Sequence, residues 1–451
     1  IIVTENEVLD LLKSIDTSKA TGPDGISPKL LKEAGSAISP SLAKLFNLSL
    51  SKCKVPKEWK KADVVPLHKK NAKTITDNYR PVSLLSCVSK LLERLVFKHM
   101  YNYFKEHFII SIHQSGFKIG DSTVHQLSYL YHMFCSAIDE KKDVRIVFCD
   151  IKKAFDRVWH TGLLYKLEKC GITGPLLKWL KDYLSERYQR VIVKGQSSDW
   201  ELIKAGVPQG SVLGPLLFLI YINDITAGID SEIKLFADDT TIYIDVEDSL
   251  IARDTMNNDL QTIQEWANQW LVTFCPRKTE SMNISFKKNQ NAVPLNFGGT
   301  PVKEVSEHKH LGLTFNKSLS WSNHITNILD SVSSMADVLK KLKYEVDRKS
   351  LETIYFTFLR PKIEYACHIW DNCTQNEETL LEGQLQLDMA REVTGARRGT
   401  SHALIYNETN WLSLKNRREL MKIKQFYKIK NGEAPDYFVN LVPDIVGQAH
   451  H

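Results

Sequence analysis

Two adjacent carboxylates in the middle of an apolar stretch constrain this chain more than any other feature. Asp238 and Asp239 interrupt residues 234–244, KLFADDTTIYI, and β-forming residues lie on both sides of the acids. The pattern predicts two strands joined by a tight turn, with both acids at its tip. An Asp-Asp turn needs no chemistry, however, so a plain β-hairpin with polar turn residues explains this stretch equally well.

A second apolar run ends in another acid. Residues 144–151, VRIVFCDI, are typical of a strand that carries Asp150 near its end. If the two segments pair, three carboxylates converge, and such a cluster repels itself unless cations lie in it. Hard oxygen ligands suit Mg²⁺, and two such ions can stabilise the attacking and leaving oxygens of a phosphoryl displacement. The three acids therefore predict a two-metal site for nucleotidyl transfer.

The positive charge of the chain is concentrated in one segment. The 451 residues carry a formal net charge of +6, whereas residues 41–110 contain fourteen Lys and Arg against five Asp and Glu, hence +9. Such an excess suits a surface that binds a polyanion. A merely solvated lysine-rich face is the alternative.

Composition and cysteine spacing point away from several other classes. Hydrophobic residues make up 43% and charged residues 25%, as in an ordinary globular protein, and the length allows two or three domains. The eight cysteines include no Cys-x-x-Cys pair and no zinc-type spacing with histidine, so a reducing compartment is expected. The nearest approach to a metal cluster, Cys367, His368 and Cys373, is expected to consist of ordinary structural residues. The longest apolar run, residues 216–222, is too short to span a bilayer.

Helical and strand patterns alternate through the middle of the chain, and helical patterns follow from residue 321. Thr4 and Glu7 predict a capping box that opens a helix. Further helices are expected at 27–34, 40–51, 86–104, 124–141, 163–170, 175–187, 212–222 and 249–271, strands at 62–67, 189–194 and 281–286, and turns or loops at 21–25, 77–81 and 289–293. The 212–222 helix is apolar on every side, which predicts burial.

Three motifs in order carry a family resemblance. They are DIKKAFD at residues 150–156, GVPQGS at 206–211 and FADD at 236–239. They resemble the palm motifs of reverse transcriptases, specifically those of non-LTR (LINE-type) retrotransposons of the jockey kind. FADD alone would be a weak signal, but the three together are specific. The resemblance runs from GPDG at 22–25 to EYACHIW at 364–370 and covers nearly the whole chain.

The resemblance implies a fold and an activity. The fold would be α+β, a right-hand polymerase with fingers, palm and thumb, an antiparallel palm sheet and a helical C-terminal region. The activity would be that of an RNA-directed DNA polymerase that copies retrotransposon RNA into cDNA from a DNA primer. The expected boundaries are an N-terminal extension at 1–40, fingers at 41–142, palm at 143–317 with finger insertions and a primer-grip hairpin, thumb at 318–380 and a helical region at 381–451.

The resemblance also implies catalytic roles. Asp150 and Asp238 would hold two Mg²⁺ ions, with Mn²⁺ as a substitute, while Asp239 would lie beside them and the Ile151 carbonyl would be a further ligand. Lys278, in PRKT at 276–279, would protonate the leaving pyrophosphate as a general acid. A plain surface lysine is the alternative for that residue.

Other residues would contact the nucleotide. Phe155 would lie under the sugar and clash with a 2′-hydroxyl, whereas an aromatic residue in a core helix is the alternative. Gln209 would lie against the incoming nucleotide, and Gly206 and Gly210 would let the backbone approach substrate closely, unless they simply close a turn.

Two basic residues and one hairpin complete the implied site. Lys69 and Arg80 would grip the triphosphate, because guanidinium and ammonium groups both suit phosphate oxygens. Lys70 competes with Lys69 for that role. Leu311 and Gly312, in HLGL at 310–313, would belong to the hairpin that positions the 3′ end of the primer.

The expected partners are an RNA template, a DNA primer and dNTPs, with no membrane. No signal peptide is seen and the chain begins at Ile1, so we expect an excerpt of a longer polyprotein with an endonuclease domain upstream. No zinc knuckle or RNase H-like pattern is recognisable. The expected location is the nucleus and cytoplasm, in an intracellular ribonucleoprotein.

Two other functions remain open from the sequence. A viral RNA-dependent RNA polymerase is disfavoured by the bulky Phe155 and by FADD in place of GDD. A domesticated, non-enzymatic RNA-binding scaffold is disfavoured by the presence of all three acids.

Overall fold

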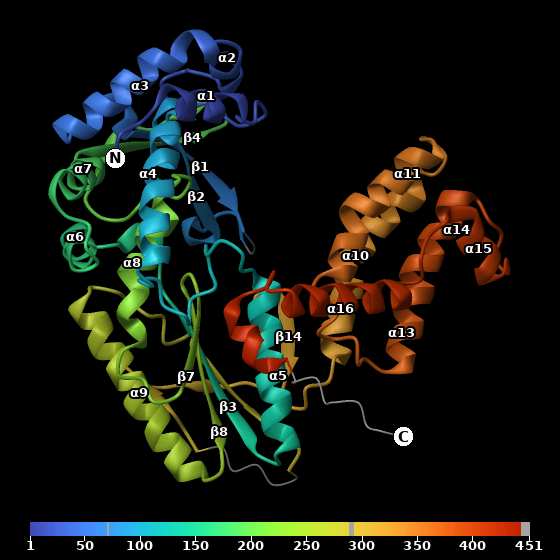
Figure 1. The fold of residues 1–451 in the computed structure, drawn as a ribbon. Helices are drawn as coiled ribbons and strands as arrows, with labels where there is room; N and C mark the ends of the chain where they lie inside the picture. The colour runs from blue at the N-terminus through green and yellow to red at the C-terminus, as the bar shows by residue number, and fades with distance from the viewer. Residues whose placement is uncertain (70–71, 288–292, 443–451) are drawn as a thin grey trace, which may run out of the picture. The chain divides into compact units, whose positions relative to one another are not determined.

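The structure is a computed structural model that describes residues 1–69, 72–287 and 293–442 (Figure 1). The chain divides into two compact units, each assembled from segments that are far apart in the sequence. Unit 1 comprises Ile1–Phe117, Cys149–Thr240 and Asn258–Lys278, and unit 2 comprises Lys118–Phe148, Thr241–Asn257 and Thr279–His451. Lys70 lies outside the described residues, as does the predicted turn at 289–293 except for Val293.

Unit 1 contains most of the helices of the first half of the chain. They are α1 Glu5–Lys13, α2 Pro28–Glu33, α3 Gly35–Lys52, α4 Cys87–Glu106, α6 His160–Lys169, α7 Gly174–Leu184 and α8 Leu213–Ile222, with the 3₁₀ turns η1 Lys57–Lys60, η2 Thr76–Asn78, η3 Phe155–Arg157 and η4 Asn223–Thr226. Helix α9, Ser249–Gln269, begins in unit 2 and ends in unit 1.

Three helix predictions can be compared with the structure directly. The capping box of α1 is confirmed, because Thr4 and Glu7 each bond the backbone of the other. The buried 212–222 helix is also confirmed, since every residue of α8 except Pro215 is buried. The predicted start of α3 at residue 40 is wrong. The helix begins five residues earlier, at Gly35, and Pro40 lies inside it.

One sheet of unit 1 has the order β2-β1-β4-β5, and β6 also pairs with β4. Its strands are β1 Lys61–His68, β2 Tyr79–Leu84, β4 Arg187–Val193, β5 Gln196–Ser197 and β6 Glu201–Ile203. Strands β1 and β2 are antiparallel, so Leu67 lies opposite Arg80, whereas β1 and β4 are parallel. The turn expected at 77–81 is therefore shorter than predicted, because the strand resumes at Tyr79. Pro81 is tolerated there since β2 is an edge strand.

The second sheet carries the acids. Its order is β12-β9-β3-β8-β7, with β3 Asp143–Asp150, β7 Glu232–Phe236, β8 Asp239–Val246, β9 Glu280–Ile284 and β12 Lys303–Glu304. Strands β3 and β8 are neighbours, which confirms the expected pairing of the two acidic segments. Strands β3 and β9 are antiparallel, but β12 runs parallel to β9, so the sheet is not antiparallel throughout as predicted.

Unit 2 is mostly helical from residue 322, as the sequence indicated. After α5 Thr123–Asp139 come the hairpins β10 Asn296–Phe297 with β11 Thr300–Pro301 and β13 Glu307–His310 with β14 Leu313–Asn316. The helices that follow are α10 Ser322–Leu342, α11 Arg348–Ile354, α12 Arg360–Glu364, α13 Gln375–Leu381, α14 Asp388–Thr394, α15 His402–Thr409 and α16 Leu414–Lys430, with the π-helical segments η5 Tyr355–Leu359 and η6 Glu382–Leu387 and the 3₁₀ turn η7 Asp436–Leu441. No helix of the described residues is both long and apolar enough to cross a membrane.

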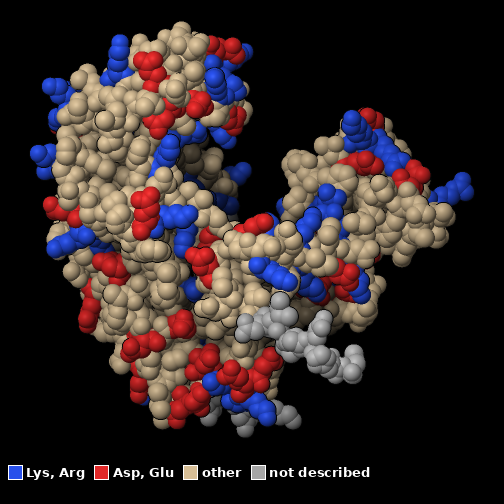
Figure 2. Space-filling view, in the orientation of Figure 1, with Lys and Arg blue, Asp and Glu red and all other residues tan. Residues whose placement is uncertain are grey.

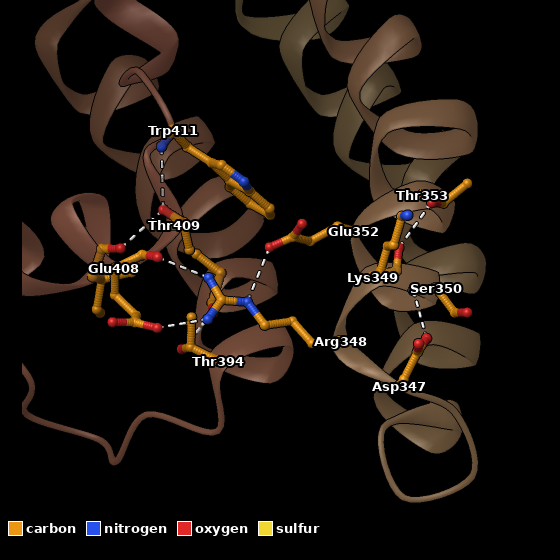
Figure 3. A network of polar contacts seen from close by, with 12 residues as sticks. Asp347, Arg348, Lys349, Ser350, Glu352, Thr353, Thr394, Glu408, Thr409 and Trp411 are labelled. Carbon is orange, nitrogen blue, oxygen red and sulfur yellow. Dashed lines mark hydrogen bonds and ion pairs between the residues drawn. The ribbon is translucent and has the colours of Figure 1, made fainter.

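A polar network ties α11 to α15 within this unit (Figure 3). Arg348 donates to Glu352 Oε1 at 3.1 Å within its own helix, and to the Glu408 carbonyl of α15 at 2.7 Å. Asp347 caps α11 by accepting from the Ser350 N–H at 2.9 Å. The two short helices are therefore joined by charge-assisted hydrogen bonds, and Leu351 and Ile405 contribute to one apolar core.

Candidate active site

The turn between β7 and β8 consists of Ala237 and Asp238, so Asp238 lies at its tip and Asp239 is the first residue of β8. Ala237 has a left-handed backbone, φ +54°, which costs energy for a residue with a Cβ. Its N–H donates to Gln114 Oε1 at 2.9 Å, and the same oxygen accepts from the Gly116 N–H at 2.7 Å. The buried Gln114 thus fixes the turn, and no motif in the sequence marked it.

The three acids influence one another electrostatically. Burial raises the pKa of Asp238, the charge of Asp150 raises it further, and Arg80 and Lys69 lower it. Desolvation by the surrounding protein likewise raises the pKa of Asp239 to about 6, and the charges of Asp238 and Asp150 add to the effect, although Asp239 is an exposed residue. The three carboxylates therefore share one site, and the two basic residues face it.

Asp150 ends β3 and is held by the segment that precedes Lys278. The Asp150 carbonyl accepts from the Cys275 N–H at 2.8 Å, and the Lys152 N–H donates to the Thr273 carbonyl at 2.8 Å. These two bonds flank Ile151 and use neither its N–H nor its carbonyl. The Lys278 ammonium lies 3.2 Å from Asp150 Oδ2. Lys278 is thus an ion-pair partner of one acid rather than a free surface lysine.

The donor set at this site fits Mg²⁺ in its chemistry. Carboxylate and carbonyl oxygens are the ligands that hard divalent cations prefer, and a cation would offset the burial and the mutual repulsion that raise the pKa of Asp238 and Asp239. Within the described residues, no three His, Cys, Asp or Glu side chains are already arranged to hold a metal ion. Lys278 contacts only Oδ2 of Asp150, so Oδ1 could bind a cation while the ion pair persists.

Phe155 lies in the turn η3, not in a core helix. Its ring stacks on Phe218 of α8, with centroids 4.6 Å apart and planes at 22°, and meets the edge of Phe117 at 5.9 Å. The Phe155 carbonyl accepts from the Val207 N–H at 2.8 Å, which ties this turn to the glycine-containing loop. Phe155 is only half-buried, so packing leaves part of its ring exposed.

The two glycines of that loop allow close approach to the protein's own backbone, and their approach to substrate stays a prediction. Gly206 has φ +91°, and a Cβ there would lie 2.6 Å from the Asp156 carbonyl oxygen. Gly210 has φ +126°, and a Cβ would lie 2.5 Å from the Ser83 carbonyl oxygen. The intervening Gln209 carbonyl accepts from the Ser83 N–H at 2.7 Å. The loop is therefore clamped to β2 and η3.

The buried Glu93 and the half-buried His160, which the sequence analysis missed, hold this loop and the helix after it. Glu93 of α4 accepts from the N–H groups of Val212 and Leu213 at 2.8 and 3.2 Å, at the first turn of α8. His160 contacts the Gly206 carbonyl through Nε2 at 2.7 Å. Glu93 lies three residues before the buried Val96 on one face of an amphipathic helix, a position that could have identified it as a buried acid.

Lys69 and Arg80 lie at one end of the β1–β2 hairpin, and both side chains are exposed. The Lys69 N–H donates to the Asn78 carbonyl at 2.8 Å, which closes the hairpin beyond β1.

The net charge of +9 in residues 41–110 overstates the number of unpaired positive charges, because acids outside that segment pair with its lysines. Lys54 and Lys60 pair with Asp182 at 2.8 and 2.9 Å, and Lys98 pairs with Glu7 at 3.2 Å. Figure 2 accordingly shows both signs of charge interspersed on the visible face.

The three acids, the glycine-containing loop, Lys69 and Arg80 all lie within residues 67–315. Those residues match the family described as reverse transcriptase (RNA-dependent DNA polymerase). This chain belongs to the reverse transcriptase family.

Curated relatives agree with this assignment. The RNA-directed DNA polymerase from mobile element jockey of Drosophila melanogaster is 31% identical over 408 residues, which are 87% of this chain and 44% of that protein. The probable RNA-directed DNA polymerases from transposons BS and X-element of the same organism are each 30% identical, covering 81% and 90% of this chain and 42% and 46% of theirs. This reverse transcriptase chain therefore spans less than half the length of these relatives.

The predicted primer-grip segment of the reverse transcriptase forms the turn of the β13–β14 hairpin in unit 2. Leu311 and Gly312 occupy the two turn positions with φ +45° and +93°. The Tyr365 hydroxyl lies 2.7 Å from the Leu311 carbonyl oxygen and 2.9 Å from Thr123 Oγ1. A Cβ at Gly312 would lie 3.0 Å from the Tyr365 ring, so this turn packs closely against its neighbour.

Proposed function

We propose that this chain is an RNA-directed DNA polymerase that copies retrotransposon RNA into cDNA from a DNA primer by two-metal-ion nucleotidyl transfer. The observation that carries the proposal is the shared site of Asp150, Asp238 and Asp239, in which burial and then the neighbouring carboxylate charges raise the pKa of Asp238 and Asp239. The same site is faced by Lys69 and Arg80, which are suited to a triphosphate. The names of the jockey and BS relatives support the activity.

The carboxylates would hold the ions and the neighbouring residues would bind the nucleotide. Asp150 and Asp238, with Asp239 beside them and the Ile151 carbonyl, would bind two Mg²⁺ ions, which stabilise charge on the attacking and leaving oxygens. Lys69 and Arg80 would bind the triphosphate. Lys278 would leave Asp150 and give its proton to the departing pyrophosphate.

The partners and subdomains follow from that reaction. Phe155 and Gln209 would contact the sugar and base of the dNTP, with Gly210 giving the loop its shape. Leu311 and Gly312 would support the primer, and an RNA template would pair with it. We propose fingers, palm and thumb at 41–142, 143–317 and 318–380, and an endonuclease domain elsewhere in a longer polyprotein.

Primer extension tests the proposal directly. Wild-type chain, Asp238→Asn and the control Asp254→Asn, an exposed acid on α9, are given an annealed RNA template and DNA primer with dNTPs or rNTPs in Mg²⁺. We expect dNTP extension by wild type and control. Asp238→Asn should lose at least a thousandfold in rate, because one ion loses its ligand, while RNA binding is retained. Extension by Asp238→Asn within tenfold of wild type would overturn the two-metal assignment, and equal use of rNTPs would overturn the DNA polymerase assignment.

A further inference from the structure

Helix α16 is the most basic helix outside the polymerase motifs. Over Leu414–Lys430 it contains seven Lys and Arg and one Glu, a formal charge of +6 that equals that of the whole chain. It lies outside residues 67–315, which carry the family match. Lys and Arg side chains are visible along the position of this helix in Figure 2, which has the orientation of Figure 1.

One face of α16 holds it on unit 2. Leu414 and Arg418 are buried, and Met421 packs against the same apolar core. Arg417 donates to Glu364 Oε2 at 2.9 Å. Further ion pairs join the first half of the helix to the unit: Arg418 with Asp371 and Glu378, Lys415 with Glu378, and Lys422 with Asp371. The first half of the helix therefore serves to attach α16 to the rest of unit 2.

The opposite face carries an apolar stripe that is exposed in the described part of the chain. Leu420, Ile423 and Tyr427 recur at three- and four-residue spacing and thus share a face, and Phe426 lies at its side. Their exposed fractions are 39%, 66%, 61% and 54%. A surface helix usually carries polar residues on the face away from the core. Exposed rings and branched side chains on that face indicate a binding surface.

Three lysines surround this stripe, and they differ from the lysines of the first half. Lys424, Lys428 and Lys430 are exposed, and none of them has an acidic partner within the described part of the chain. Lys424 and Lys428 are four residues apart, so they lie about 6 Å apart along the helix axis. Ile423 and Tyr427 form one column along the helix and Lys424 and Lys428 form the next, so the exposed Tyr427 ring lies beside a column of cations.

We propose that this outer face of α16, defined by Leu420, Ile423, Lys424, Phe426, Tyr427, Lys428 and Lys430, binds single-stranded RNA. Aromatic rings stack on bases regardless of sequence, and lysines neutralise the phosphates between them. An acidic protein segment would be served by the lysines but would leave the rings without a specific partner. The inference rests on the proposed function only in naming RNA as the nucleic acid, because this binding needs neither the carboxylates nor a metal ion.

The test is anisotropy of a labelled, unstructured single-stranded RNA in EDTA, with the variants Tyr427→Ala, Tyr427→Phe and the double variant Lys424→Gln/Lys428→Gln. The matched control is Lys341→Gln/Lys349→Gln, which removes the same charge from exposed positions on α10 and α11. Tyr427→Ala should weaken RNA binding about tenfold through lost stacking. Tyr427→Phe keeps the aromatic ring and should bind RNA as the wild type does. The Lys424/Lys428 variant should lower the slope of log K against log salt by about 1.4, whereas the control leaves it unchanged.

The outcomes separate this proposal from the polymerase proposal. Extension of a short preformed template–primer duplex should stay within twofold of wild type in every α16 variant, and Asp238→Asn should bind the single strand normally. Unchanged RNA affinity in Tyr427→Ala together with an unchanged salt slope in Lys424→Gln/Lys428→Gln would overturn the proposal. The proposal would also be overturned if the α16 variants lost binding to vesicles of anionic phospholipid but kept wild-type RNA binding. The face would then be assigned to a membrane surface. Unaltered thermal unfolding of Tyr427→Ala would show that the exposed ring is dispensable for folding.

Discussion

The side-chain amide of Gln209 is fixed by Asp156, because Gln209 Nε2 donates to Asp156 Oδ1 at 2.9 Å. A carboxylate only accepts hydrogen bonds, so the amide nitrogen must face Asp156 and the amide oxygen is directed elsewhere. Burial raises the pKa of Asp156, while the Gln209 bond and the charges of Lys153 and Lys69 oppose that rise. Asp156 therefore acts as a positioning residue for Gln209, a role that its place in the DIKKAFD motif did not reveal.

Asp156→Ala should raise KM for dNTP about tenfold and leave kcat within about threefold, because a charge-assisted hydrogen bond that orients Gln209 is lost. Asp156→Asn retains an accepting oxygen and should have a smaller effect. Steady-state primer extension with varied dNTP measures both constants. If both variants keep the wild-type KM, Asp156 does not position Gln209 for the nucleotide.

Asp239→Asn should stabilise the metal-free protein at pH 8 while lowering polymerase activity. The folded-state pKa of Asp239 is raised to about 6 from an ordinary value of 3.8. Its contribution to stability is therefore fully present below about pH 4 and is lost as pH rises through 6. The side chain is partly solvated, so we expect a Tm increase of only about 1–3 °C in EDTA. Melting curves from pH 4 to 8 measure it, and a lower Tm for the variant at pH 8 would contradict the assignment.

Phe155→Val should raise ribonucleotide use relative to deoxynucleotide use by about tenfold or more, because the exposed part of the ring is what would meet a 2′-hydroxyl. The measurement is the ratio of kcat/KM for the two sugars. Phe218→Leu is the control, since it removes the ring that stacks on Phe155 at 4.6 Å but leaves Phe155 itself. An unchanged ratio in Phe155→Val would show that Phe155 only packs.

Gly210→Ala should destabilise unit 1 by about 1–3 kcal/mol, because φ +126° is strained for any other residue and the new Cβ would lie 2.5 Å from the Ser83 carbonyl oxygen. Gly383→Ala is the control, since its Cβ would meet no atom within 4 Å and its φ is not in the positive range that strains a side chain. Thermal unfolding of the two variants gives the comparison. Equal melting temperatures would show that the loop at Gly210 can relax away from β2.

Local sequence pattern was sufficient for the elements that build the site. The apolar runs around Asp150 and Asp238 predicted strands, which β3, β7 and β8 confirm, and the all-apolar 212–222 stretch predicted the buried α8. The alternation of side chains in a strand and the burial of a helix depend on residues a few positions apart. That information is present in any short window of the chain.

The sequence did not determine how the charged groups are paired. Lys278 pairs with Asp150 across 128 positions, Lys60 is neutralised by Asp182, and the buried Glu93 serves a helix that begins 120 positions later. Gln114 holds the strained Ala237 in the same way. Whether a charge is free, paired or buried depends on which distant segments pack together, because solvation and Coulomb energies act through space and not along the chain. The sequence by itself determined the elements and the three acids, and the tertiary structure decided which side chains hold them in place.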